Sequence, residues 1–118
     1  MGVRNGYRKP SQLGDDRWCA VVGGHNIIKK PFMVVDCGSA ISIDLVNFNA
    51  KHEGGYILSG FEGYGNSFLH THKLKNLKIK KINLRTRTSI AKETSDALVK
   101  GYLLMVTSAI ERIYKEFA

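Results

Sequence analysis

The 118-residue sequence lacks any apolar run approaching the length needed to cross a bilayer. Its first ten residues contain no hydrophobic signal core, and Gly6 stands where a myristoylation motif requires Ser or Thr. These absences argue against a membrane-spanning protein and favour a cytoplasmic one. The length suits one compact domain with a core and is too short for two domains of ordinary size.

Cysteine and metal-ligand patterns are equally sparse. The two cysteines, Cys19 and Cys37, have neither the spacing of a zinc site nor the density of a disulfide framework. We expect both to be reduced, partly buried thiols. His70 and His72 lie two positions apart with no third ligand evident nearby, so the sequence predicts no metal site there.

Acidic residues are few, with 10 against 18 Lys and Arg, which gives a formal net charge of +8. Residues 73–87 contain seven of these cations and neither an acidic nor an aromatic residue. A surface for single-stranded nucleic acid would interleave aromatic side chains on which bases stack. We therefore favour a solvated face, such as an exposed strand protected by Lys, with polyanion binding as the alternative.

The central stretch, residues 32–47, predicts two strands with a break between them. Phe32 to Val35 and Ile41 to Val46 are apolar and rich in β-branched residues, which is typical of strands. In the break, Gly38 and Ser39 could form a phosphate cradle. Asp36, at the exit of a buried strand, would then require a cation or hydrogen-bond donors. The alternative is an ordinary hairpin whose Asp36 caps its own turn.

The other segments predict an α/β chain. Acidic residues open a helix over residues 15–22, which Gly23 and Gly24 should stop. Asp15, Asp16 and Arg17 can be read as a cap and an ion pair or as carboxylates beside a cleft, where a general base could work. The remaining expected elements are a polar loop at 47–53, a strand at 54–58, a turn or helix entry at 59–67, a strand or extended connector at 77–84 and a long helix at 94–117. Gly101 inside that helix suggests close packing or approach to a ligand.

Four motifs in order resemble the type III pantothenate kinase family, which includes the Bvg accessory factor. They are YRKPSQLGDDRW at residues 7–18, VVDCGSAISIDLV at 34–46, GGYILSG at 54–60 and ETSDALVKG at 93–101. The resemblance implies ATP-dependent phosphorylation of pantothenate to 4'-phosphopantothenate, the first step of coenzyme A biosynthesis. It also implies an incomplete ribonuclease-H-like domain of the actin-like ATPase superfamily, to which sugar kinases belong. In that interpretation residues 1–13 are a connector, and residues 14–118 are a partial kinase domain with a hinge helix, a three-stranded meander and helices.

The resemblance also assigns roles to individual residues. Asp16 would be the catalytic base and Arg17 would hold pantothenate, with Gly14 in the same motif. Asp36 would face the metal ion. The phosphate turn would be Gly38, Ser39 and Ala40, and the glycines near substrate would be Gly54, Gly55 and Gly60.

The family resemblance further implies Mg²⁺, a monovalent cation (K⁺ or NH₄⁺) and a homodimer. Ser59 replaces the proline usual in the glycine loop, and His72 and Lys73 fall where the family has a Thr-Ala pair. The chain resembles the middle of a kinase, so we expect it to have no appreciable turnover by itself. A different class of function stays open, namely a noncatalytic regulatory or polyanion-binding protein that retains half of the kinase fold.

Overall fold

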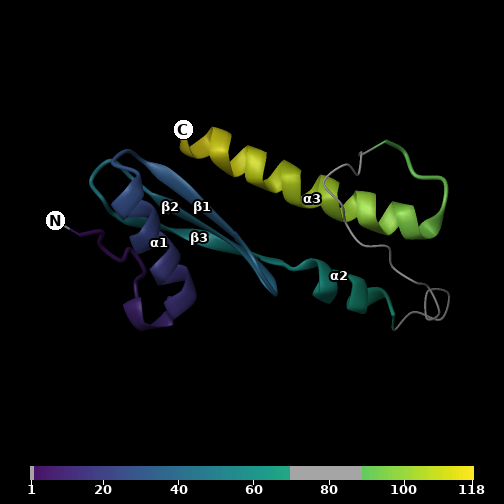
Figure 1. Ribbon diagram of the computed structural model, residues 1–118, viewed down its shortest axis with the longest axis horizontal. Coiled ribbons are helices and arrows are strands. Elements are labelled where there is room, and N and C mark those ends of the chain that lie inside the picture. The colour runs from purple at the N-terminus through teal and green to yellow at the C-terminus, as the bar shows by residue number, and fades with distance from the viewer. Residues whose placement is uncertain (1, 70–88) are drawn as a thin grey trace. The chain divides into compact units, whose positions relative to one another are not determined.

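The computed structural model describes residues 2–69 and 89–118 and has a mixed α/β fold, as predicted (Figure 1). The chain forms two compact units, Met1–Leu58 and Ser59–Ala118. The first unit contains a short 3₁₀ turn, Pro10–Gln12, then α1 (Asp15–Ile27), β1 (Phe32–Cys37), β2 (Ala40–Val46) and β3 (His52–Ser59), which ends at the boundary. The second unit contains α2 (Phe61–Phe68) and α3 (Thr94–Phe117). None of the helices described is both long enough and apolar enough to span a membrane.

The three strands form one sheet in the order β1-β2-β3, so β2 is the central strand. β1 and β2 are antiparallel, with Phe32 opposite Val46 and Cys37 opposite Ile41. The predicted hairpin is therefore confirmed. β3 begins at His52, two residues before the predicted start at Gly54. The polar loop between β2 and β3 is therefore shorter than expected.

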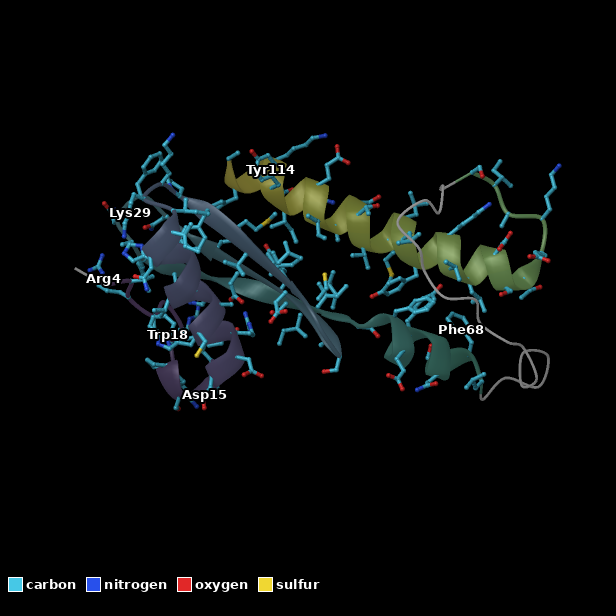
Figure 2. All side chains as sticks on the ribbon, viewed as in Figure 1. Arg4, Asp15, Trp18, Lys29, Phe68 and Tyr114 are labelled. Carbon is cyan, nitrogen blue, oxygen red and sulfur yellow. The ribbon has the colours of Figure 1, made fainter. Side chains whose placement is uncertain are left out.

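Helix α1 packs against β1 and β2 and buries an apolar cluster of the first unit. Val21 and Val46 are completely buried, Phe32 is nearly so, and the half-buried Trp18 packs against them. Asp15 lies at the beginning of α1 and Trp18 about one turn later (Figure 2).

The prediction that Gly23 and Gly24 end this helix is wrong, because α1 continues to Ile27. Packing of an apolar face outweighs the roughly 1 kcal/mol that each helical glycine costs. Gly24 also has a packing role, since a Cβ at this position would lie 2.6 Å from the Phe32 ring.

The far end of the hairpin is open to solvent. Asp36 and Cys37 are exposed, so the expectation that Asp36 leaves a buried strand is wrong. The buried cluster lies at the other end of β1, around Phe32, and among the described strands β1 is at the edge of the sheet. Cys19, on α1, is exposed as well, so neither cysteine is the partly buried thiol that the sequence suggested.

The segment before α1 is tied to the start of β3. The Arg4 amide donates to the Ala50 carbonyl at 2.9 Å, and the His52 amide donates to the Arg4 carbonyl at 2.8 Å. Gly6 lies so close to β3 that a Cβ there would fall 1.6 Å from the His52 carbonyl oxygen. Only glycine permits this approach, which carries the next residue, Tyr7, to the sheet.

In the second unit, aromatic rings join α2 to α3. The Tyr102 ring of α3 lies 5.2 Å from Phe61 and 5.0 Å from Tyr64, between ring centroids. The Tyr102 hydroxyl donates to the Ser59 carbonyl at 3.0 Å. A Cβ at Gly101 would lie 3.6 Å from the Tyr64 hydroxyl, an ordinary van der Waals distance, and Gly101 is exposed, so the described structure does not show the close packing predicted at this glycine. The long helix predicted over 94–117 is confirmed, and residues 59–67 do lead into a helix.

Several sequence-based expectations fall on residues 70–88, outside the described residues. They concern the basic run at 73–87, the extended segment at 77–84, the histidine pair and the His72–Lys73 position. These expectations stay predictions.

The burial of Ile43, completely enclosed on the central strand, generates a stability prediction. Ile43→Ala should lower the free energy of unfolding of the first unit by about 2–5 kcal/mol, because it removes buried methyl groups and leaves a cavity. Ile57→Ala, on β3 at 63% exposure, is the matched control and should change it by less than about 0.5 kcal/mol. Denaturant titration followed by the fluorescence of Trp18, the one tryptophan, measures both. Equal losses would contradict this description of the core.

Candidate functional site

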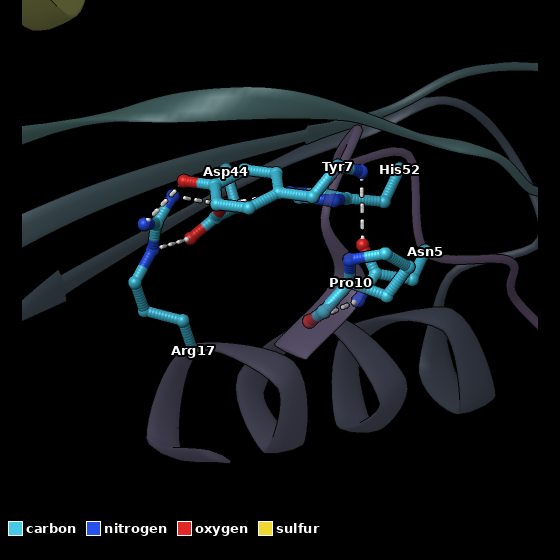
Figure 3. A network of polar contacts seen from close by, with 6 residues as sticks. All are labelled: Asn5, Tyr7, Pro10, Arg17, Asp44 and His52. Atoms are coloured by element: carbon cyan, nitrogen blue, oxygen red, sulfur yellow. Dashed lines mark hydrogen bonds and ion pairs between the residues drawn. The ribbon is translucent and has the colours of Figure 1, made fainter. Parts of the chain in front are cut away.

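A salt bridge between Arg17 and Asp44 lies between α1 and the sheet (Figure 3). Arg17 Nε donates to Asp44 Oδ2 at 2.9 Å, and Nη2 donates to Oδ1 at 2.6 Å. This two-pronged geometry matches the planar guanidinium to the planar carboxylate and fixes both orientations. The pair connects the first turn of α1 to the central strand.

Asp44 is buried, with 1% of its surface exposed, although it carries a carboxylate in the middle of β2. A buried carboxylate is costly unless charged or polar partners surround it. Here His52 supplies a further partner, since its Nε2 lies 2.7 Å from Asp44 Oδ1. Because an ionised carboxylate only accepts hydrogen bonds, we assign the Nε2 proton to His52 as the donor. Its other ring nitrogen, Nδ1, is buried and has no hydrogen-bond partner among the described residues.

Tyr7 completes the network from the N-terminal segment. Its hydroxyl accepts a 2.7 Å hydrogen bond from Arg17 Nη1, and the guanidinium carbon lies 5.5 Å from its ring centroid. The Tyr7 ring also lies 5.6 Å from the His52 ring. A turn around Asn5, whose Oδ1 accepts from the Tyr7 amide at 2.9 Å, fixes the backbone here. The expected connector thus contributes a side chain to the site.

Gly55 leaves the space that the ion pair occupies. A Cβ at Gly55 would lie 2.0 Å from the Ile43 carbonyl oxygen, 2.6 Å from Asp44 Oδ1 and 2.8 Å from Arg17 Nη2. The adjacent Gly54 has a φ of 116°, a backbone conformation that other residues rarely adopt. The family resemblance implies that these glycines approach a substrate, and in the structure Gly55 lies against the Arg17–Asp44 pair.

Electrostatics keep Arg17 charged. Its hydrogen bonds to Asp44 raise the pKa of the Arg17 guanidinium above the ordinary value, although burial acts in the opposite direction. Since a raised pKa favours the protonated form, the cation persists at every pH below it. Arg17 has five N–H donors, of which Asp44 and Tyr7 take three. Among the described residues, two N–H groups are left for another acceptor.

Asp16 and Gly14 lie beside this pair at the start of α1. Asp16 is exposed in the first turn, where a negative charge is favourable against the helix dipole. Gly14 is the N-cap residue, and a Cβ there would meet nothing within 4 Å in the part of the chain described. The cap and ion pair considered for Asp15, Asp16 and Arg17 are wrong for the described structure, because Gly14 is the N-cap without a side-chain hydrogen bond and Arg17 pairs with Asp44.

The turn predicted to hold phosphate is the exposed tip of the hairpin. The Gly38 amide donates to the Ala40 carbonyl at 2.9 Å, so the turn uses this donor itself. Gly38 does not have a positive φ, so the unusual backbone angles considered for it are not used. Ser39 stands exposed at the tip, and its hydroxyl and amide are the groups this turn could present to a phosphate.

Asp36 faces Ser42 across the hairpin and is the residue expected to meet a metal ion. Within residues 2–69 and 89–118, no three His, Cys, Asp or Glu side chains gather as a metal cluster. A single carboxylate does not make a protein cage for Mg²⁺, but it fits an ion that phosphate oxygens also bind. The residues present therefore fit a metal carried with a nucleotide.

Gly60 belongs to the second unit, so it is described apart from the residues above. It is the N-cap of α2 and is buried. The Ser59 side chain donates to the Gly60 carbonyl at 3.0 Å.

Of the predicted site residues, the structure brings together Arg17 and Gly55, with Asp16 next to Arg17 in sequence.

Sequence reasoning missed Tyr7, Asp44 and His52. A signal existed for Asp44, because a lone carboxylate inside the mostly apolar run 41–46 requires a buried cation. Tyr7 lies in a quoted motif, but its contact depends on the bridge between Arg4 and the start of β3. No pattern in the sequence pairs His52 with Asp44.

Gly55→Ala tests the site geometry. The new methyl group should push β3 from the ion pair and destabilise the first unit by about 1–3 kcal/mol. Gly23→Ala is the control, because a Cβ there meets nothing within 4 Å in the described structure, and it should stabilise α1 by about 0.5–1 kcal/mol. Both are read from Trp18 fluorescence in denaturant. A neutral or stabilising Gly55→Ala would mean that the close approach is not required.

Comparisons with known proteins identify the family. Residues 1–116 match the family model of type III pantothenate kinase. The chain is 36% identical over 118 residues to the type III pantothenate kinase of Marinomonas sp. (strain MWYL1), covering 98% of this chain and 48% of that protein. The one from Pseudomonas paraeruginosa is also 36% identical, with 96% and 46% covered. The chain spans about half the length of these curated relatives. Together with the resemblance of the four sequence motifs, this match establishes that the chain belongs to the type III pantothenate kinase family.

Proposed function

We propose that this chain supplies the pantothenate-binding part of an ATP-dependent kinase that converts pantothenate to 4'-phosphopantothenate in coenzyme A biosynthesis. Family membership over residues 1–116 supports the reaction class. The observation that carries the proposal is the Arg17 guanidinium, held by a buried carboxylate directly beside the exposed Asp16. A fixed cation next to an accessible carboxylate suits a substrate that has both an acidic group and a hydroxyl.

Asp16 acts as the proton acceptor in this proposal. Phosphoryl transfer requires little covalent chemistry from a protein beyond an oriented acceptor, screened phosphate charge and a group that takes the acceptor proton. Asp16 is exposed and is not paired with the adjacent Arg17, whose hydrogen bonds to side chains go to Asp44 and Tyr7. Its carboxylate is therefore available to the pantothenate hydroxyl.

Arg17 binds the acidic end of pantothenate. Pantothenate carries a carboxylate, which is a strong acceptor for guanidinium N–H groups. Two such groups are not used by Asp44 or Tyr7 in the described structure. Gly14, Gly54 and Gly55 would allow backbone close to the same ligand. Gly60, in the second unit, is proposed from the family resemblance alone as a glycine near substrate.

Ser39, with Gly38 and Ala40, would contact ATP phosphates at the hairpin tip. Asp36 would hold Mg²⁺ there together with those phosphates, and bound Mg²⁺ would screen their charge. From the family alone, we also propose that the enzyme needs a monovalent cation, K⁺ or NH₄⁺. The same basis supports an actin-like architecture of two closing domains, a homodimer and a cytoplasmic location.

The role of Asp16 can be tested in a chimera in which residues 1–116 replace the matching segment of the Pseudomonas relative. Asp16→Asn should lower kcat for phosphopantothenate formation about 100-fold or more, because it removes the proton acceptor and keeps its shape. Asp36→Asn should instead raise the Mg²⁺ and ATP concentrations needed for turnover. Formation of phosphopantothenate is followed directly by mass spectrometry.

Asp15→Asn is the matched control, since Asp15 is the neighbouring exposed carboxylate in the same helical turn. It should leave kcat within about twofold of the unsubstituted chimera, because it only weakens a favourable interaction with the helix dipole. Similar small effects of Asp15→Asn and Asp16→Asn would contradict the assignment of Asp16.

A further inference from the structure

We propose that Asp44 is a positioning residue that sets the direction of the Arg17 guanidinium, and that pantothenate affinity depends on it. This inference rests on the proposed function. Asp44 is buried beneath Arg17 and would not itself touch the substrate. Its effect passes through the two hydrogen bonds that it accepts from the Arg17 side chain.

Asp44 is held rigidly enough for this role. It lies on β2, the central strand of the sheet, with paired strands on both sides. Its two oxygens accept from Arg17 Nε, Arg17 Nη2 and His52 Nε2, at 2.9, 2.6 and 2.7 Å. His52 is itself fully buried. A carboxylate fixed by strand backbone and by three donors cannot turn without losing several charge-assisted bonds.

Fold stability alone does not explain such a pair. A buried ion pair contributes little net stability compared with apolar residues of the same volume, because both charges must lose their water. The pair also requires glycine at position 55, next to Asp44 Oδ1 and Arg17 Nη2. What the arrangement does provide is a guanidinium whose orientation is already set.

The Arg17 side chain is 12% exposed, so most of it is enclosed and one part reaches solvent. Tyr7 holds Nη1 at 2.7 Å, which leaves the guanidinium fixed at all three nitrogens. Ordering a flexible arginine on binding costs conformational entropy, and a guanidinium that is already ordered avoids this cost. Asp44, His52 and Tyr7 therefore raise the affinity of Arg17 for a carboxylate ligand.

Binding of pantothenate to the 118-residue chain, measured by isothermal titration calorimetry, tests this inference. Asp44→Asn should weaken binding about 10- to 100-fold, the range for losing a charge-assisted hydrogen bond. Asp44→Glu keeps the charge but moves the carboxylate by one methylene, and it should weaken binding as well. Ile43→Ala is the matched control, because it destabilises the same strand and leaves the ion pair intact, so its affinity should stay within about threefold at a temperature where it is folded.

A second readout separates this inference from the proposed function. In ¹⁵N–¹H spectra, the Arg17 Nε–H signal should be protected from exchange in the unsubstituted chain and in Ile43→Ala, and it should lose protection in Asp44→Asn. Pantothenate binding that Asp44→Asn leaves within threefold would overturn the inference and leave the function standing. No pantothenate binding by the unsubstituted chain would overturn the proposed function. In that case, a protected Arg17 signal that depends on Asp44 would still support the positioning role, and an unprotected one would overturn it.

Discussion

The buried carboxylate of Asp44 imposes the constraint on which the first unit depends. A charge in the middle of an apolar strand must be neutralised, and the guanidinium of Arg17 does this from the first turn of α1. The pairing fixes how α1 lies on the sheet. It also requires a residue without a side chain at Gly55 on the neighbouring strand. The N-terminal segment then closes the network, because its bridge to β3 carries Tyr7 to the guanidinium.

Local pattern predicted the elements, while the site depended on contacts between distant residues. The strands around residues 32–35 and 41–46 were predictable because β-branched runs are bounded by turn residues, and the helix over 94–117 because its apolar spacing is regular. The end of α1 was not predictable, because burial of Val21 against Phe32 outweighs the glycine signal at 23 and 24. Asp16 and Arg17 came from the family resemblance. Pairing Arg17 with Asp44, 27 residues away, requires the fold itself.

The close pairing of a helix-borne arginine with a strand-borne aspartate gives the proposed kinase chemistry a physical basis. Arg17 is enclosed and oriented, whereas its neighbour Asp16 is exposed. Adjacent residues on one helical turn thus have different environments, one suited to holding a ligand and the other to accepting a proton. The hairpin tip around Ser39 is an exposed turn at the end of the sheet away from the apolar cluster, where a phosphate can approach without displacing packed side chains.

The strength of the coupling between Arg17 and Asp44 is the most direct measure of this account. A double-mutant cycle with Arg17→Leu, Asp44→Asn and the double variant gives it from free energies of unfolding, read from Trp18 fluorescence. Each single substitution leaves a buried or partly buried charge without its partner, so the two losses should not add. We expect a coupling energy of about 2–3 kcal/mol. Losses that add to within about 0.5 kcal/mol would contradict it, because the two side chains would then act independently.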